Sequence, residues 1–300
     1  MDLALLLAGT GCGFLHSVYS ALSKVVLKRG LKTPLLFLLY VNVFQALGTF
    51  ALWVAVKPTL PGEALGPLLV AGGTCVLAYF FLYASLACGD VSSVMPIMGS
   101  KVIFSGALAH VMLNEGHSWP IYLAVSLVAV SVGVLGYSPT KGEHSRFQAK
   151  PIVLMLLCCV VFSFTDIFIK RSLVHLDPYN FLVYYNLIVG VASLLIIPYL
   201  KHRGVSLRVG PRNLRMIGLS ALFLVSSTLL FVIALNLADG VVIPNILMAT
   251  RGVFIVLISL VLSHRGSKAL DEQSRGVYAF RFLASLLIVL SIVIALWESK

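Results

Sequence analysis

Charged residues are scarce in this 300-residue chain: 11% are Asp, Glu, Lys or Arg, whereas 59% are hydrophobic. Soluble domains carry about a quarter charged residues, so an ordinary soluble protein is excluded. The mean hydropathy of +1.01 reflects long apolar runs that recur along the whole chain. Each run is long enough to cross a hydrocarbon core of about 30 Å. The sequence therefore predicts a polytopic membrane protein.

Several chemical signatures are missing as well. The five cysteines form no CxxC pair and have no His/Cys ligand spacing, which argues against a disulfide framework or a metal site. No HExxH, GxSxG or P-loop motif occurs, which disfavours an intramembrane enzyme and an ATP-driven pump. The net charge of +11 does not indicate a nucleic-acid partner, because most basic residues lie in short loops between apolar runs. We expect a protein that is not an enzyme and that needs no cofactor.

Proline, glycine and charged clusters divide the chain into ten expected membrane-spanning helices. Their ranges are 3–27, 34–56, 64–87, 91–113, 119–137, 151–173, 178–200, 213–237, 240–263 and 277–297. Each must be helical, because the lipid interior offers no hydrogen-bond partner to an unpaired backbone group. Fourteen Lys and Arg residues fall on the side of the first loop and four on the opposite side. The positive-inside rule then places both termini outside the cytoplasm.

An internal repeat is visible in short matched strings. "PLLFLLYVN" (34–42) and "PYNFLVYYN" (178–186) share five of nine positions, and "LACGD" (86–90) resembles "LNLAD" (235–239). Residues 1–145 and 146–300 then form two halves with five spans each. Because five is odd, the second half enters the membrane from the opposite side. The predicted fold is an all-α membrane protein with ten transmembrane helices in two five-helix inverted-topology repeats.

The chain resembles the drug/metabolite transporter superfamily, in particular its EamA-like branch. The resemblance rests on the ten-span repeat and on "MPIMGSKVIFSGALAHVMLNEGHSWPIYLAVSLVAVSVGVLGY" (95–137). That string has a proline early in the fourth helix, Glu115 just past its end, and Gly133 and Gly136 in the next helix. The resemblance implies a ten-helix transporter fold. It leaves the substrate open among amino acids, nucleotide sugars, sugar phosphates, drugs and lipid precursors.

Two cations, Lys101 and Arg251, lie near the middle of the fourth and ninth expected spans. A Lys or Arg at the bilayer centre costs about 2.5–3.5 kcal/mol, so such residues usually face a bundle interior or an aqueous cavity. Asp166 is the one acid clearly inside an expected span, and Lys170 competes for it from four residues away. At least one positive charge is left over, which predicts a midplane site for a phosphate or carboxylate. The resemblance agrees, because cations on these two helices bind phosphate in the triose-phosphate and nucleotide-sugar branches.

Asp166 is also the candidate proton-coupling residue, because a buried carboxylate can titrate with conformation. A plain ion pair with Lys170 is the alternative. Other candidate substrate contacts are His16 and Ser20, which lie on a polar stripe of the first span at helical spacing, and Asn42, Tyr83, Tyr184 and Asn186. The stripe could instead serve close helix packing through small residues. The asparagines could instead brace neighbouring helices, and the tyrosines could belong to an interfacial aromatic belt.

The leading hypothesis is an alternating-access secondary transporter of a small organic metabolite that bears a phosphate or carboxylate. The alternative is a proton-coupled exporter of amino acids or amphipathic drugs. The partners we expect are the anionic solute, the lipid bilayer and a coupling proton or counter-substrate, with a homodimer as the candidate assembly. The expected location is a bacterial cytoplasmic (inner) membrane, with the chain crossing it many times.

Overall fold

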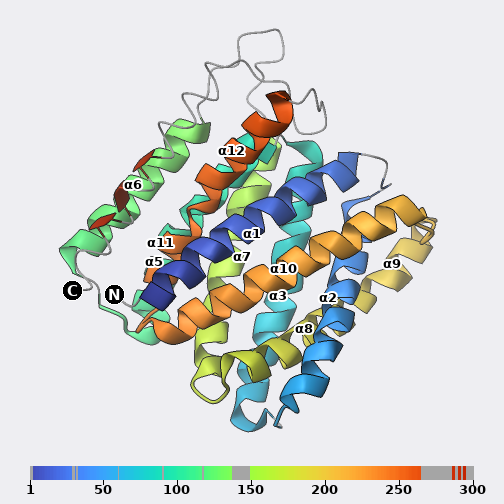
Figure 1. Ribbon diagram of the computed structural model, residues 1–300, viewed down its shortest axis with the longest axis horizontal. Coiled ribbons are helices and arrows are strands. Elements are labelled where there is room, and N and C mark those ends of the chain that lie inside the picture. Colours follow the sequence, from blue (N-terminus) through green and yellow to red (C-terminus); the bar gives the residue numbers. More distant parts are fainter. Residues whose placement is uncertain are drawn as a thin grey trace.

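The computed structural model shows a bundle in which all regular structure of the described residues is helical (Figure 1). The described residues are 3–28, 31, 33–59, 61–89, 91–116, 118–136, 149–264, 286–287, 290–291 and 293–294. The expected domain boundary at 145/146 and most of the expected span 277–297 lie outside them.

The helices follow the predicted ranges closely at most boundaries. The first half contains α1 (Leu3–Lys28), α2 (Pro34–Val56), the 3-10 turn η1 (Gly62–Ala64), α3 (Leu65–Cys88), α4 (Val91–Ile97), the 3-10 turn η2 (Met98–Ser100), α5 (Lys101–Leu113) and α6 (Trp119–Gly136). The second half contains α7 (Ala149–Leu173), α8 (Pro178–Leu194), α9 (Ile196–His202), α10 (Pro211–Leu237), α11 (Val242–Met248) and α12 (Arg251–His264).

Seven helical segments of the described chain are long and apolar enough to cross a membrane. Large apolar side chains also stand exposed on their outer faces, among them Leu47, Phe50 and Leu222, each more than 60% exposed. A contiguous apolar exterior is unfavourable in water and favourable in lipid. The protein is therefore a multi-pass membrane protein, and its described part is all-helical.

Three of the expected spans are interrupted in the structure. The range 91–113 is divided by η2 into α4 and α5, 178–200 is divided at Leu195 into α8 and α9, and 240–263 is divided at 249–250 into α11 and α12. Two of these breaks, at η2 and at 249–250, fall directly before the two predicted midplane cations, so Lys101 begins α5 and Arg251 begins α12.

Hydroxyl groups satisfy backbone carbonyls at both breaks. Ser100 Oγ donates to the carbonyl oxygen of Ile97 at 2.8 Å, and Thr250 Oγ1 donates to that of Leu247 at 2.7 Å. Backbone groups freed from a helix are tolerated at membrane depth only where they find other partners. The two hydroxyls supply those partners one residue before each cation.

The two halves of the chain interleave. The most extensive helix–helix contacts are those of α3 with α7, α1 with α10, and α2 with α8. Each of these pairs joins the first half to the second. In Figure 1, α1 (blue) runs beside α10 (orange), with α11 and α12 on its other side. The broken helices pack likewise across the halves, with α5 on α7 and α12 on α1. This packing brings both breaks to the centre of the bundle.

Two lysines cap helix ends in the same way. Lys24 Nζ donates to the carbonyl oxygens of Leu86 at 2.8 Å and Gly89 at 2.5 Å, where α3 ends. Lys170 Nζ donates to the carbonyl oxygens of residues 235 and 238 at 2.9 and 2.6 Å, where α10 ends. The last carbonyls of a helix lack intrahelical partners, so these contacts stabilise both ends. Lys170 therefore caps α10 and is not the ion-pair partner of Asp166 in this structure.

Replacing Lys24 with Met is expected to destabilise the protein by about 1–3 kcal/mol, because two buried carbonyls lose a charged donor. Lys170→Met should cost less, since Lys170 is only half-buried and water can reach part of the site. The measurement is thermal unfolding of the purified protein in detergent. Lys201→Met, at an exposed position of α9, is the matched control. Equal melting temperatures for all four proteins would contradict the capping role.

Candidate functional site

The centre of the bundle holds a buried cation at each helix break. Lys101 is 3% exposed and Arg251 is 2% exposed. Their backbone carbonyls are bound alike: Ser163 Oγ on α7 donates to that of Lys101 at 3.0 Å, and Ser17 Oγ on α1 donates to that of Arg251 at 2.9 Å. The backbone environments of the two cations are therefore closely similar.

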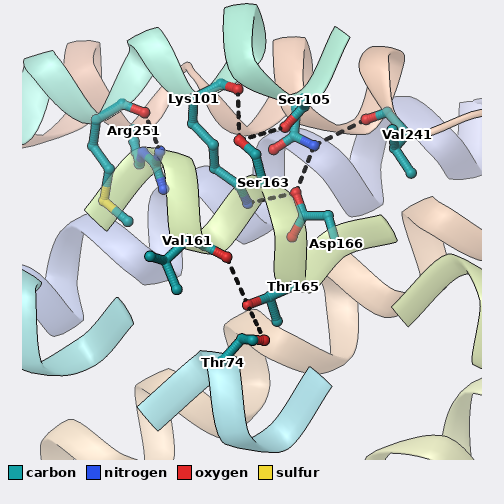
Figure 2. Close-up of polar contacts among 11 residues, drawn as sticks. Thr74, Lys101, Ser105, Val161, Ser163, Thr165, Asp166, Val241 and Arg251 are labelled. Carbon is teal, nitrogen blue, oxygen red and sulfur yellow. Dashed lines mark hydrogen bonds and ion pairs between the residues drawn. The ribbon is translucent and has the colours of Figure 1, made fainter. Parts of the chain in front are cut away.

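Lys101 is neutralised by Asp166. Its Nζ lies 2.7 Å from Asp166 Oδ2, and that oxygen also accepts a 2.8 Å hydrogen bond from Asn245 Nδ2. Figure 2 shows this pair beside the bond from Ser163 to the Lys101 carbonyl. The ammonium group also lies 4.7 Å from the centre of the Phe231 ring. A short pair with extra hydrogen bonds is the arrangement in which two opposite charges tolerate burial.

Arg251 has no such partner. Its Nη2 donates to the carbonyl oxygen of Met98 at 2.6 Å, which is a backbone group of the other helix break. Its Nε and Nη1 are buried and have no hydrogen-bond partner among the described residues. His16 Nε2 is unpartnered there too. Within the described chain, the positive charge of Arg251 is therefore uncompensated.

Among the residues that the structure describes, Lys101 has a carboxylate partner and Arg251 has none because of one residue on the helix that packs against each cation. Three residues beyond Ser163, α7 carries Asp166; three residues beyond Ser17, α1 carries Ser20. The Ser20 hydroxyl donates to the backbone carbonyl of His16 at 2.7 Å and supplies no charge. One cation thus receives a carboxylate, and the other receives none.

A cavity of about 40 Å³ lies between these groups. Its polar wall consists of Lys101, Asp166, Arg251 and His16, which can carry charge, and the hydroxyl residues Thr165, Ser227 and Thr228. Its apolar wall includes Tyr79, Phe162, Tyr185, Phe231, Met98 and Met248. A cavity of this volume has room for a few waters, whereas ligand pockets usually measure about 300–1,000 Å³. The cavity is therefore smaller than a usual ligand pocket.

Four of the predicted site residues line this cavity: Lys101, Arg251, His16 and Asp166. Ser20 lies one turn from His16 and is not among the lining residues. Tyr83 is fully buried outside the lining, where its hydroxyl pairs with that of Tyr19.

The other predicted contacts lie between helices α2 and α8. Asn42 Nδ2 donates to Ser193 Oγ at 2.8 Å, and Asn186 accepts from Gln45 Nε2 at 2.5 Å. These contacts correspond to the bracing alternative. Tyr184 is partly buried and packs edge-on against Trp53, with ring centres 6.0 Å apart. None of these side chains is among the lining residues of the central cavity.

Two phenylalanines that line the cavity carried no signal in the sequence. Phe162 and Phe231 are two of the chain's 17 phenylalanines, and nothing in their spacing separates them from lipid-facing rings. Tyr185, adjacent to the predicted Tyr184, lines the cavity because consecutive helical residues point about 100° apart. Asn245 could have been noticed, since a buried amide on a broken helix requires a partner.

Glu115, which carries part of the family resemblance, lies at the start of α11. Its Oε2 accepts a 3.2 Å hydrogen bond from the backbone N–H of Val241, and its carboxylate lies against Gly240. A β-carbon at Gly240 would come within 2.4 Å of that carboxylate. Helix α11 also supplies Asn245, which binds Asp166. The end of α5 and the Lys101–Asp166 pair therefore both contact this short helix.

Gly13 allows α1 to approach the break beside Arg251. A β-carbon there would lie 2.4 Å from Thr250 Oγ1 and 3.1 Å from the backbone nitrogen of Arg251. Gly13→Ala is expected to cost about 1–3 kcal/mol, because the break must move to make room. Gly218→Ala is the control, since its β-carbon would meet nothing within 4 Å. Thermal unfolding in detergent tests both, and an unchanged melting temperature for Gly13→Ala would contradict the close approach.

Comparisons with known proteins bear on the fold alone. No model of a protein family and no curated protein matches this chain. The chain is similar to a protein of known crystal structure, with a TM-score of 0.68 and 16% sequence identity. The alignment covers 100% of this chain and 98% of that one. A similarity at this identity indicates that the two chains share a fold over their whole length.

Proposed function

We propose that the protein is a secondary transporter that carries a small organic anion by alternating access. The observation that carries the proposal is Arg251, a 2% exposed cation that lines a central cavity and has two unpartnered nitrogens among the described residues. A buried uncompensated charge is costly, so its presence requires a compensating gain. Binding of an anion to the guanidinium supplies that gain, with two parallel hydrogen bonds available.

We also propose the ten-helix architecture of two inverted five-helix repeats, as in the EamA-like branch of the drug/metabolite transporters. Three pairs of matched contacts support it. In each pair, one residue from each half makes the same kind of contact. The pairs are the capping lysines 24 and 170, the serines 17 and 163, and the hydroxyls of residues 100 and 250. An inverted repeat relates each such pair through an axis in the membrane plane.

In this proposal the two helix breaks form the moving part of the site. Broken helices place backbone groups and side chains at the midplane, and rocking of one bundle exposes them to either side in turn. The cavity of about 40 Å³ is the contracted form, which must widen to admit a solute. The solute's anionic group would bind Arg251, and its apolar part would pack against Tyr79, Phe162 and Phe231.

A proton-coupled exporter is the second candidate, and the position of Asp166 favours it. Asp166 is 1% exposed and lines the same cavity, so its protonation would change both the charge of the site and the Lys101 pair. A buried carboxylate whose partner changes with conformation is a suitable proton carrier. If Asp166→Asn retains uptake driven by a pH gradient, Asp166 is not the proton site.

Uptake into proteoliposomes tests the main proposal. Purified protein is reconstituted and screened with radiolabelled phosphorylated metabolites and free amino acids, with Arg251→Gln and the exposed-site variant Arg212→Gln in parallel. We expect at least one anionic solute to accumulate with wild type and Arg212→Gln but not with Arg251→Gln. Absence of uptake for every anion, or uptake that survives Arg251→Gln unchanged, would contradict the proposal.

We place both termini outside the cytoplasm, in a bacterial inner membrane, from the distribution of basic residues. Glu63 and His202 lie exposed on opposite sides in this arrangement. In intact cells, with Cys88 replaced by Ser to remove the exposed thiol, Glu63→Cys should react with a membrane-impermeant maleimide. His202→Cys should react only after lysis. The reverse labelling pattern would invert the topology.

A further inference from the structure

We infer that the site is specific for a monoanionic group, such as a carboxylate or a phosphodiester, and discriminates against dianions. The inference rests on the proposed function and specifies the class of solute that the same cavity takes. It follows from the number of charges that line the cavity and from how each is paired.

The polar wall carries one net positive charge. Lys101 and Asp166 are 2.7 Å apart and cancel each other, and Arg251 adds one charge that no described residue compensates. His16 lines the same cavity and is neutral, because a third positive charge there would face burial and repulsion from the two cations. Among the described residues that line the cavity, Asp166 is the only acid.

The net charge of the closed cavity determines which solute can be carried across. A bound monoanion brings the site to zero, whereas a dianion leaves one negative charge and a neutral solute leaves one positive charge. Net charge in a site sealed from water is strongly unfavourable, so the electroneutral complex closes most readily. The asymmetry between Asp166 on α7 and Ser20 on α1 therefore determines the preferred charge.

The unpartnered atoms also fit a small planar or tetrahedral acceptor group. The unpartnered Nε and Nη1 of Arg251 each lie beside Nη2, which donates one of its two hydrogens to Met98, so the second Nη2 hydrogen and one of these nitrogens can hold two oxygens of one anion. His16 Nε2 offers a further polar contact from α1. The remaining wall is aromatic, with the Tyr79 and Phe162 rings packed edge-on at 5.2 Å between centres, and it suits an apolar or aromatic body.

Four probes with the same phenyl body separate charge from shape. They are benzoate and methyl phenyl phosphate (monoanions), phenyl phosphate (a dianion at pH 8, since its second pKa is near 6) and benzamide (neutral). Binding to the purified full-length protein in detergent is read from the dose-dependent rise in melting temperature. We expect both monoanions to bind at least about tenfold more tightly than phenyl phosphate and benzamide. The inference is overturned if phenyl phosphate binds as tightly as methyl phenyl phosphate, or more tightly.

Charge variants provide a second test. The double variant Lys101→Met/Asp166→Asn keeps the net charge of the site at plus one, so it should keep the preference for monoanions. Asp166→Asn alone raises the net charge to plus two and should shift the preference towards phenyl phosphate. A double variant that loses the monoanion preference would overturn the inference even if the single variant does not fold.

The same measurements separate this inference from the proposed function. If wild type binds phenyl phosphate most tightly and Arg251→Gln no longer binds it, the monoanion specificity fails while anion transport through Arg251 stands. If no anionic probe binds more tightly than benzamide, both fail.

Discussion

Replacing Arg251 with Gln is expected to lower uptake of the transported anion about 100-fold or more. Among the described residues, the guanidinium supplies the one uncompensated charge that lines the cavity. Losing a charged hydrogen-bonding partner for a buried anion costs about 3 kcal/mol. Arg251→Lys should recover only part of the activity, because an ammonium group lacks the two-pronged donor geometry. Initial rates of uptake into proteoliposomes provide the measurement.

The same variant should not lose stability. Because Arg251 is buried without an acidic partner in the described chain, removing its charge relieves a desolvation cost. We expect the melting temperature of Arg251→Gln to equal or exceed that of wild type, in contrast to its loss of transport. Such opposite effects are typical of functional sites that trade stability for activity. A variant that both unfolds more easily and loses transport would indicate a structural role for Arg251.

Removing only one charge of the Lys101–Asp166 pair is expected to have the largest effect on stability. Breaking a buried ion pair typically costs about 3–5 kcal/mol, because the remaining charge is left unpaired in a low-dielectric interior. Lys101→Met and Asp166→Asn should each lower the melting temperature strongly. The double variant Lys101→Met/Asp166→Asn should recover most of the loss, because the buried charge that remains in each single variant is gone.

A double-mutant cycle in detergent measures this effect. The coupling energy between the two substitutions should be large and should oppose the single effects. If the double variant is as unstable as the sum of the two single variants, the pair is not the interaction that stabilises this part of the bundle. Lys201→Met, on the exposed surface, serves as the control for removal of a lysine charge.

Helix positions were largely predictable from the sequence because the bilayer sets a strong requirement. Apolar runs bounded by Pro, Gly and charged residues predicted 34–56, and α2 spans Pro34–Val56. The two helix breaks were not predicted, since an apolar run with a single proline reads equally well as one continuous helix. Their physical cause is local: the hydroxyls of Ser100 and Thr250 replace the helix hydrogen bonds, and hydropathy does not report such contacts.

The partner of Asp166 could not be chosen from sequence separation. Lys170 lies one helical turn away, which favours an intrahelical pair, but its ammonium group reaches the end of α10 instead. Lys101 lies 65 positions earlier in the chain and contacts Asp166 because α5 packs on α7. Long-range helix packing decided the pairing, and it also left Arg251 as the uncompensated cation.

Similar reasons explain which polar residues reached the cavity. His16 lines it from α1, whereas Asn42 and Asn186 point towards the partner helix and hydrogen-bond across the α2–α8 contact. A buried amide costs least where a neighbouring helix offers donors and acceptors, and this contact supplies them. The repeat-matched asparagines were recognisable as a pair, but the spacing of their strings did not reveal which helix face they occupy.

The location of a bound anion tests the central claim most directly. A crystal structure of the full-length protein with 4-bromobenzoate would place the ring through the anomalous signal of bromine. We predict bromine within the aromatic wall formed by Tyr79, Phe162 and Phe231, with the carboxylate bonded to the guanidinium of Arg251 and the Lys101–Asp166 pair intact. A carboxylate bound to Lys101 in place of Asp166, or bromine found only outside the cavity, would contradict the assignment of Arg251 as the anion-binding residue.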